Sequence, residues 1–383
     1  MARKLRMLLA LMLLWPTAGC WDRIEIEERG FVVGTALDAA EEGQIKLTFQ
    51  IVVPTQMKGS SGQKSEGGSP FINLSSTASS VFKAARKMSN EISRSPYLAH
   101  NQVIIISEAL AGTEHIGDVL DLFVRDPENR RASNIMVAEG EASKILEIHS
   151  KIETLPVQYI RSTQENKDKS ESITPPTNMG ELHHFLLSKS SYALPRVSIT
   201  QDDRVSTSGA AVFNGENYRF MGFLDNDETT GRNMMQGTVK TASLELVVHG
   251  KQLVYEVREF NRIIRVHLDD RGLPEFDVEI SVRGNIGEAE LEESEIVREL
   301  NGEIKRKAEE RIKEIAMDVI QKAQNDYKSD FLGFWKKCQE QEYETWNRYK
   351  DDWDRGQNIF SQCKIHVHAD ARVRTIGTIT GTE

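Results

Sequence analysis

The chain has 383 residues, of which 39% are apolar and 28% are charged, and this near-average composition excludes collagen-like, disulfide-rich, polytopic membrane and wholly disordered proteins. Its length leaves room for two or three domains, each with its own core. The 48 basic and 58 acidic side chains give a formal net charge of −10, which argues against a general nucleic-acid-binding protein because phosphate neutralisation needs a basic surface.

The N-terminal segment has the form of an export signal. A basic start precedes an apolar run from Met7 to Trp15, which is about half as long as a membrane-spanning helix. This pattern predicts a cleavable signal peptide over residues 1–19. Small or modest residues then lead into Cys20, as in a bacterial lipobox, so we expect Cys20 to carry a diacylglycerol and an N-linked acyl chain such as palmitate. The alternative is an ordinary signal peptide in which Cys20 is incidental.

Residues 20–149 predict a small α/β domain. A buried strand at 31–36 and an alternating strand at 45–53 flank an acidic turn, which indicates a hairpin. Residues 54–70 are rich in Gly and Ser and predict a mobile loop. The elements expected after the loop are, in chain order, a helix from about 77, a strand at 103–106, a helix at 114–124, a strand at 134–138 and a helix at 141–149. Helices that alternate with short buried strands are typical of an α/β domain.

Residues 150–206 give weaker signals, because several prolines interrupt the patterns and a polar tract runs from Thr163 to Thr174. We interpret this segment as a bridging or middle domain.

Residues 207–375 predict an antiparallel meander sheet packed with long helices. The expected strands lie at 244–248, 254–257, 263–268 and 276–282. A long helix over about 296–319 has one apolar stripe, and the aromatic residues of 331–353 are interpreted as core. A final alternating strand at 363–373 is expected to complete the sheet. The predicted fold class is therefore α+β, with several domains.

No common catalytic motif is present in the sequence. It lacks a G-x-S-x-G elbow, a P-loop, a G-x-G-x-x-G turn after a strand, an H-E-x-x-H pair and a C-x-x-C pair. Adjacent residues on a helix point apart, so His183 and His184 are not expected to share a metal ion. His366 and His368 share one face of the last strand, but the charged neighbours on that face indicate a solvated surface. We therefore expect no cofactor, no metal ion and no catalytic residue.

Cys338 and Cys363 both fall on apolar faces of their predicted elements. Export into an oxidising space would permit a disulfide between them, and two reduced core cysteines are the alternative.

The order and spacing of several segments of this sequence resemble the pattern of one known family. They are Cys20-Trp21-Asp22, the strand 31–38, Gln50 to Pro54, Ala99 to Gln102 before 103–106, Leu122 to Pro127 with Arg130 and Arg131, Gly209 to Phe213 with Gly222, Glu228 to Gly231, and Asp330 to Phe334. Together they resemble the Ger(x)C family, the lipoprotein C subunit of spore germinant receptors.

The resemblance implies a non-enzymatic, three-domain α+β lipoprotein on the outer face of the spore inner membrane. Members are expected to assemble with a large A subunit and a transmembrane B subunit, in a complex that lets spores respond to nutrients. Only Cys20 carries over as a functional site, and contact with the nutrient germinant is expected to be indirect at most.

Two other functions stay open from the sequence. A solute-binding lipoprotein of a transporter would need two similar α/β lobes around a cleft, whereas the two halves of this chain have different patterns. An exported enzyme of cell-wall or lipid metabolism would need a catalytic constellation that the sequence does not display.

Overall fold

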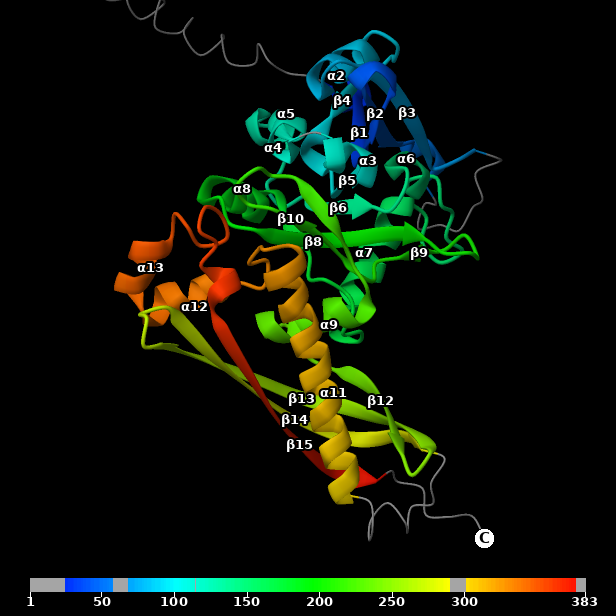
Figure 1. Cartoon of the computed structure of the whole chain (residues 1–383). Coiled ribbons are helices and arrows are strands. Elements are labelled where there is room, and N and C mark those ends of the chain that lie inside the picture. The colour runs from blue at the N-terminus through cyan, green and yellow to red at the C-terminus, as the bar shows by residue number, and fades with distance from the viewer. Residues whose placement is uncertain (1–24, 58–67, 114, 290–300, 377–383) are drawn as a thin grey trace, which may run out of the picture.

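The computed structural model describes residues 25–57, 68–113, 115–289 and 301–376. Figure 1 shows two halves, which we call the N-terminal half (the described residues up to 224) and the C-terminal half (those from 225 to 376). The expected loop at 54–70 lies largely outside the described residues, as does the first part of the helix expected from 296.

The N-terminal half is built on an eleven-stranded mixed sheet with the main order β11-β10-β8-β6-β5-β1-β2-β3. Its strands are β1 (Arg29–Ala39), β2 (Ile45–Val52), β3 (Phe71–Ala78), β4 (Ser95–Tyr97), β5 (Val103–Ser107), β6 (Asn134–Ala138), β7 (Thr177–Asn178), β8 (Tyr192–Ile199), β9 (Val205–Ser206), β10 (Ala210–Phe213) and β11 (Phe220–Leu224). The central strands β1, β5, β6 and β8 are parallel neighbours. Antiparallel strands extend the sheet at both ends.

Helices cover both faces of this sheet. They are α2 (Val81–Ser89), α3 (Glu108–Thr113), α4 (Ile116–Val119), α5 (Asp121–Arg125), α6 (Ala142–Ile145), α7 (Pro156–Glu165) and α8 (Met179–Ser188). Side chains of α2 to α5 and α8 enter one apolar core, and those of α6 and α7 enter another. Burial on both faces explains why β5 reads as the uninterrupted apolar run predicted from the sequence.

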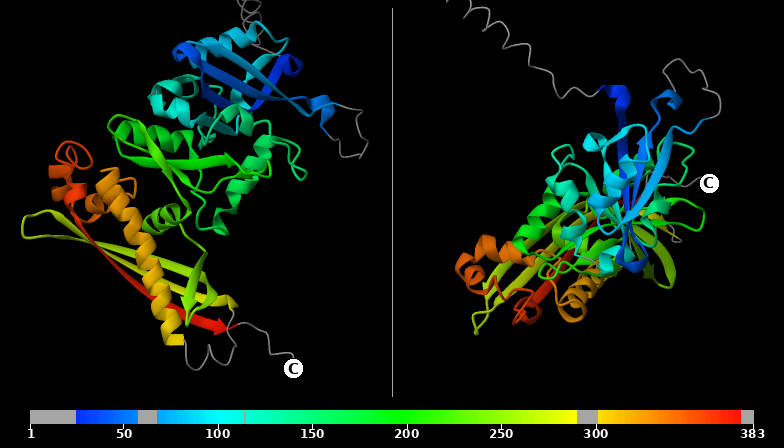
Figure 2. Two further views of the ribbon diagram at one scale, coloured as in Figure 1. Left: turned by 45° about the vertical axis from the view of Figure 1, so that its right-hand side comes forward. Right: turned by 90° about the horizontal axis from the view of Figure 1, so that it is seen from above.

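The C-terminal half has a four-stranded sheet of order β12-β13-β14-β15, crossed by one long helix (Figure 2). The strands are β12 (Ala242–Val248), β13 (Lys251–Leu268), β14 (Pro274–Ala289) and β15 (Lys364–Ile376). The first three form the predicted antiparallel meander. The last strand completes the sheet but pairs in parallel with β14, because the long intervening segment returns the chain to the other end of the sheet.

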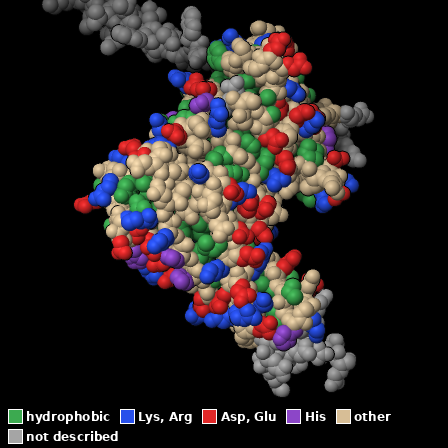
Figure 3. All heavy atoms as spheres, viewed as in Figure 1, with side chains coloured by type: hydrophobic (Ala, Val, Ile, Leu, Met, Phe, Trp, Pro, Cys, Tyr) green, Lys and Arg blue, Asp and Glu red, His purple; other side chains and the backbone are tan. Residues whose placement is uncertain are grey.

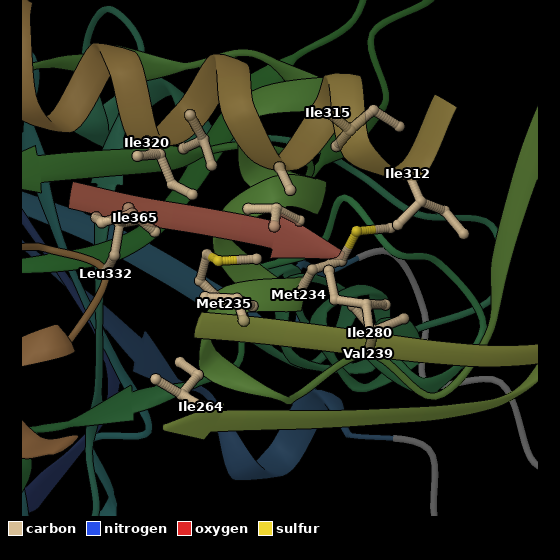
Figure 4. Close-up of a cluster of buried hydrophobic side chains, with 14 of the residues drawn as sticks. Met234, Met235, Val239, Ile264, Ile280, Ile312, Ile315, Ile320, Leu332 and Ile365 are labelled. Atoms are coloured by element: carbon tan, nitrogen blue, oxygen red, sulfur yellow. The ribbon is translucent and has the colours of Figure 1, made fainter. Parts of the chain in front are cut away.

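Helix α11 (Asn301–Gln321) packs its apolar stripe against this sheet and against α9 (Asn226–Gln236). Figure 4 shows Ile312, Ile315 and Ile320 of α11 in one close-up with Met234 and Met235 of α9. All five side chains are buried in one cluster. The shorter helices α12 (Phe334–Gln341) and α13 (Tyr343–Tyr349) follow and complete the predicted aromatic core at one end of the sheet.

The α+β class and the overall arrangement agree with the sequence prediction, but several elements differ. Strand β3 runs to Ala78, so the helix that was expected from about 77 begins only at Val81. The helix expected at 114–124 is the short pair α4 and α5. Segment 150–206, predicted as a bridge, contributes α7, α8 and the interior strand β8. The two strands expected at 254–268 are the single strand β13, which bulges after Val257.

Candidate functional site

The predicted lipid acceptor, Cys20, lies outside the described residues, as does the signal peptide. Among the helices that the structure describes, none is both long enough and apolar enough to cross a membrane. The anchor therefore stays a prediction from the sequence.

Cys338 and Cys363 are both buried, and the structure has them as free thiols. The disulfide that export would permit between them is not formed in this structure. Cys363 Sγ lies 3.2 Å from the carbonyl oxygen of Ile359. Burial raises the pKa of Cys338 to about 12 and raises that of Cys363 further. Because the thiolate is the reactive form, both groups have the character of inert core thiols.

The four candidate histidines lie in two places. His183 and His184 follow each other on α8, and His184 lines a cavity described below. His366 and His368 are exposed on β15, where His366 Nε2 lies 2.8 Å from Glu275 Oε1. Within residues 25–57, 68–113, 115–289 and 301–376, no three His, Cys, Asp or Glu side chains gather as they would around a metal ion.

Asp330 has a buried carboxyl group. In the sequence it stood out only as the first residue of the family segment Asp330 to Phe334. It accepts the backbone N–H groups of Gly333, Phe334 and Trp335 at 2.8, 3.0 and 2.6 Å, and Trp353 Nε1 at 2.8 Å. Burial raises its pKa to about 7, against the effect of these donors. Both carboxyl oxygens accept hydrogen bonds from N–H groups at the start of α12, and one also accepts from the Trp353 indole. The carboxyl group therefore stabilises the local fold and has no oxygen left to face a substrate.

A cavity of about 700 Å³ opens between β12, α9 and α11. Figure 3 shows acidic side chains gathered near the waist of the molecule, where the two halves meet. Arg311 in the cavity wall pairs with Asp227 of α9 and, at 2.7 Å, with Glu314 of its own helix. Glu171 accepts the backbone N–H of Ser243 at 3.3 Å. These charges are satisfied within the protein, which indicates a structural contact between α9, α11 and β12.

A second cavity, about 500 Å³, lies between α8, α9 and α12. We call it the junction pocket, since α8 belongs to the N-terminal half and the other two helices to the C-terminal half. Its ionisable lining residues are Glu181, His184, Arg232 and Lys336. Arg232 could not be identified from the sequence, because three segments that are distant along the chain meet around it. The sequence gives one indication of its importance, since Arg232 directly follows the family segment Glu228 to Gly231.

Comparison with known proteins identifies the family. Residues 22–199 match the domain described as the spore germination protein N-terminal domain, and residues 208–377 match the domain described as spore germination B3/GerAC like, C-terminal. The chain is 25% identical to spore germination protein B3 of Bacillus subtilis (strain 168), over 94% of this chain and 95% of that protein. It is 27% identical to spore germination protein A3 of the same organism, over 98% of each.

A solved structure shares the fold. The crystal structure of the GerBC protein superposes with a TM-score of 0.61 at 21% identity, and the match covers 92% of this chain and 100% of that one. The two domain matches, in this order over most of the chain, and the full-length relatives show that the protein belongs to the Ger(x)C family of spore germination proteins.

Proposed function

We propose that this chain is the lipid-anchored C subunit of a spore germinant receptor and docks with the receptor's A and B membrane subunits. The observation that carries the proposal is the pair of spore germination domains that together span residues 22–377. The expected lipid on Cys20 would hold the subunit on the outer face of the spore inner membrane, since two or more acyl chains suffice for stable attachment. In that position its folded part contributes to the response to nutrient by binding other proteins.

The role we propose is non-enzymatic. Burial raises the pKa values of Asp330 and Asp354, a feature that often marks a catalytic acid. Four donors inside the protein occupy the oxygens of Asp330, however, and Asp354 accepts the backbone N–H of Asp330. The two halves also differ in architecture, with a large mixed sheet in one and a four-stranded sheet in the other. A solute-binding lipoprotein of the kind considered from the sequence would need two similar lobes, so we favour the receptor subunit.

The decisive experiment is purification of the tagged protein from spore inner membranes in mild detergent, with mass spectrometry of the proteins that accompany it. We expect one large two-part protein and one polytopic membrane protein, corresponding to the A and B subunits. Recovery of transporter subunits in their place would overturn the proposal. An untagged strain processed in parallel identifies proteins that bind the resin.

Replacement of the predicted lipid acceptor tests the anchor separately. Cys20→Ala is expected to move the protein from the membrane fraction to the wash, because no acyl chain can then be attached. Arg23→Ala keeps the thiol and serves as the matched control, which should remain in the membrane fraction. Immunoblots of the fractions measure both. Membrane retention of Cys20→Ala, at a level equal to that of the control, would contradict lipid anchoring.

A further inference from the structure

Arg232 carries a buried positive charge on α9. Its side chain is 8% exposed and lines the junction pocket. Guanidinium Nη1 donates to Asn233 Oδ1 at 3.1 Å, and within the described part of the chain Nε has no acceptor. Burial lowers the pKa of Arg232 to about 10, and no nearby carboxylate acts to raise it. The charge is therefore desolvated, with the amide oxygen of Asn233 as an acceptor but without a counter-charge from the described residues around it.

Other cations near the contact between α9 and α11 have carboxylate partners. Lys322, after α11, lies 2.6 Å from Glu228 Oε1, and Arg311 pairs with Asp227 and Glu314. A buried charge is costly unless a counter-charge and hydrogen bonds satisfy it. Arg232, by contrast, has no carboxylate partner among the described residues, and it lines a cavity where a ligand can supply one.

The walls of the junction pocket combine a net positive charge with apolar surface. Lys336 of α12 brings a second cation, whose Nζ lies 5.7 Å from the centre of the Phe185 ring. Among the described lining residues the one carboxylate is that of Glu181, and its Oε2 already accepts the backbone N–H of Asn178 at 2.9 Å in the cap of α8. Pro175, Pro176 and Phe185 supply apolar contacts.

We propose that the junction pocket binds a carboxylate group, paired with the free edge of the Arg232 guanidinium, with the apolar part of the ligand against Pro176 and Phe185. A guanidinium presents two parallel N–H donors that match a planar carboxylate. The lining carries two cations, Arg232 and Lys336, and one carboxylate, Glu181, so a single negative charge balances it whereas a phosphate dianion would exceed that balance. Because α8 and α9 come from different halves, the bound group would contact both.

The carboxylate could come from a small molecule or from an acidic side chain or C-terminus of another protein. Both sources use the same chemistry at Arg232, and the test below separates them. Binding by the isolated chain does not depend on the receptor-subunit proposal, so failure of one leaves the other standing.

The first measurement is titration of the purified full-length protein, in detergent, with sodium butyrate, followed by NMR saturation transfer and by urea unfolding. Sodium phosphate and sodium chloride at equal ionic strength are the comparison anions. We expect saturable butyrate binding that phosphate and chloride do not reproduce, and a higher urea midpoint with butyrate present. Absence of saturable binding, or equal binding of phosphate, would overturn the proposal.

Variants assign the binding to Arg232. Arg232→Met keeps the length of the side chain but removes the charge, and we expect loss of butyrate binding with no decrease of the ligand-free urea midpoint. Arg232→Lys keeps the charge without the paired donors, and we expect at least tenfold weaker binding. Arg219→Met, at an exposed position away from the pocket, is the matched control and should bind as the wild type does. Unchanged binding by Arg232→Met, or a clearly lowered midpoint, would contradict the proposal.

A second arm identifies the source of the carboxylate and rests on the proposed receptor assembly. If a partner protein supplies it, the complex purified from spore membranes will not bind butyrate, and Arg232→Met will reduce recovery of the partner. If a small molecule supplies it, the complex will still bind butyrate and recovery will be unchanged. Loss of binding to the isolated Arg232→Met chain is expected in both cases.

Discussion

At the scale of single residues, Asp330 shows how a buried carboxyl group can hold a local fold together. The chain leaves α11 through a short π-helical turn, Lys322–Asp326, and must then begin α12 inside the apolar core. The first N–H groups of a helix have no intrahelical acceptor, so burying them without a partner would cost free energy. Asp330 accepts three of them, at Gly333, Phe334 and Trp335, together with the indole N–H of Trp353.

We therefore predict that Asp330→Ala lowers the free energy of unfolding by about 3 kcal/mol or more, because it leaves several buried donors unsatisfied. Asp326→Ala, at an exposed position four residues earlier, should change it by less than about 0.5 kcal/mol. Urea unfolding monitored by circular dichroism measures both. Equal stabilities of the two variants would show that the four hydrogen bonds contribute little.

The same variant tests the raised pKa of Asp330. With a pKa of about 7 in the folded state, well above its ordinary value, the folded protein retains a proton that the unfolded chain loses over roughly pH 4–7. The stability that comes from this group is therefore present at low pH and declines as the pH rises through 7. The difference in stability between the wild type and Asp330→Ala should be larger at pH 5 than at pH 8. An equal or opposite difference would contradict this assignment.

At the scale of elements, the contact between α9 and α11 depends on a glycine. A Cβ atom at Gly231 would lie 2.5 Å from the carbonyl oxygen of Ile315 and 2.8 Å from Val319 Cγ1. Both distances are shorter than a normal contact, and one of the atoms is backbone. The absence of a side chain at Gly231 lets the two helices approach closely enough to bury Met234 and Met235 in the shared core.

Gly231→Ala should therefore destabilise the protein by about 1–3 kcal/mol, the usual cost of adding volume to a packed core. Gly302 is the matched control, since a Cβ there meets nothing within 4 Å and the residue lies in the first turn of α11. Gly302→Ala should leave stability unchanged or raise it by up to about 1 kcal/mol, because Ala favours a helix. Thermal unfolding of both variants decides the matter, and a stable Gly231→Ala protein would mean that the helices can shift apart.

The helices and strands also show which elements can be predicted from sequence patterns alone. Strands covered on both faces, such as β5, have continuous apolar runs, and the meander strands alternate regularly, so both were predicted. Strand β3 has the sequence FINLSSTA, which contains too many polar residues to be recognised as a strand. Strand β8 contains Pro195, a residue that usually argues against an interior strand. The junction pocket could not be predicted, because periodicity does not show which distant segments meet.

At the scale of the whole molecule, one apolar cluster crosses the boundary between the halves. Ala193, Val212 and Leu224 of the large sheet belong to the same buried cluster as Met234 of α9 and the residues of α11 and β12 to β15. Hydrogen bonds also join the two halves, since Asn233 Nδ2 of α9 donates to the carbonyl oxygens of Glu171 and Ile173 at 2.8 and 3.0 Å. A shared core favours cooperative unfolding of the two halves.

A probe in one half and a perturbation in the other can test this coupling. Trp335, Trp346 and Trp353 all lie in the C-terminal half, and Trp21 can be replaced by Phe so that fluorescence of the mature chain reports that half alone. In the N-terminal half, buried Asp38 accepts the backbone N–H groups of Ala142 and Ser143 at 2.6 and 3.0 Å, where α6 begins. Loss of such a helix cap typically costs about 1–2 kcal/mol.

In that background, Asp38→Ala is predicted to lower the urea midpoint of tryptophan fluorescence as much as the midpoint of circular dichroism, because unfolding of the N-terminal half would expose the core that it shares with the C-terminal half. Asp121→Ala, which removes an exposed ion pair with Arg125, should leave both midpoints nearly unchanged. If Asp38→Ala shifted circular dichroism alone, the halves would unfold independently. In that event a carboxylate bound in the junction pocket could not couple their stabilities through the core, and any effect of the ligand on the N-terminal half would have to pass through its direct contacts with α8.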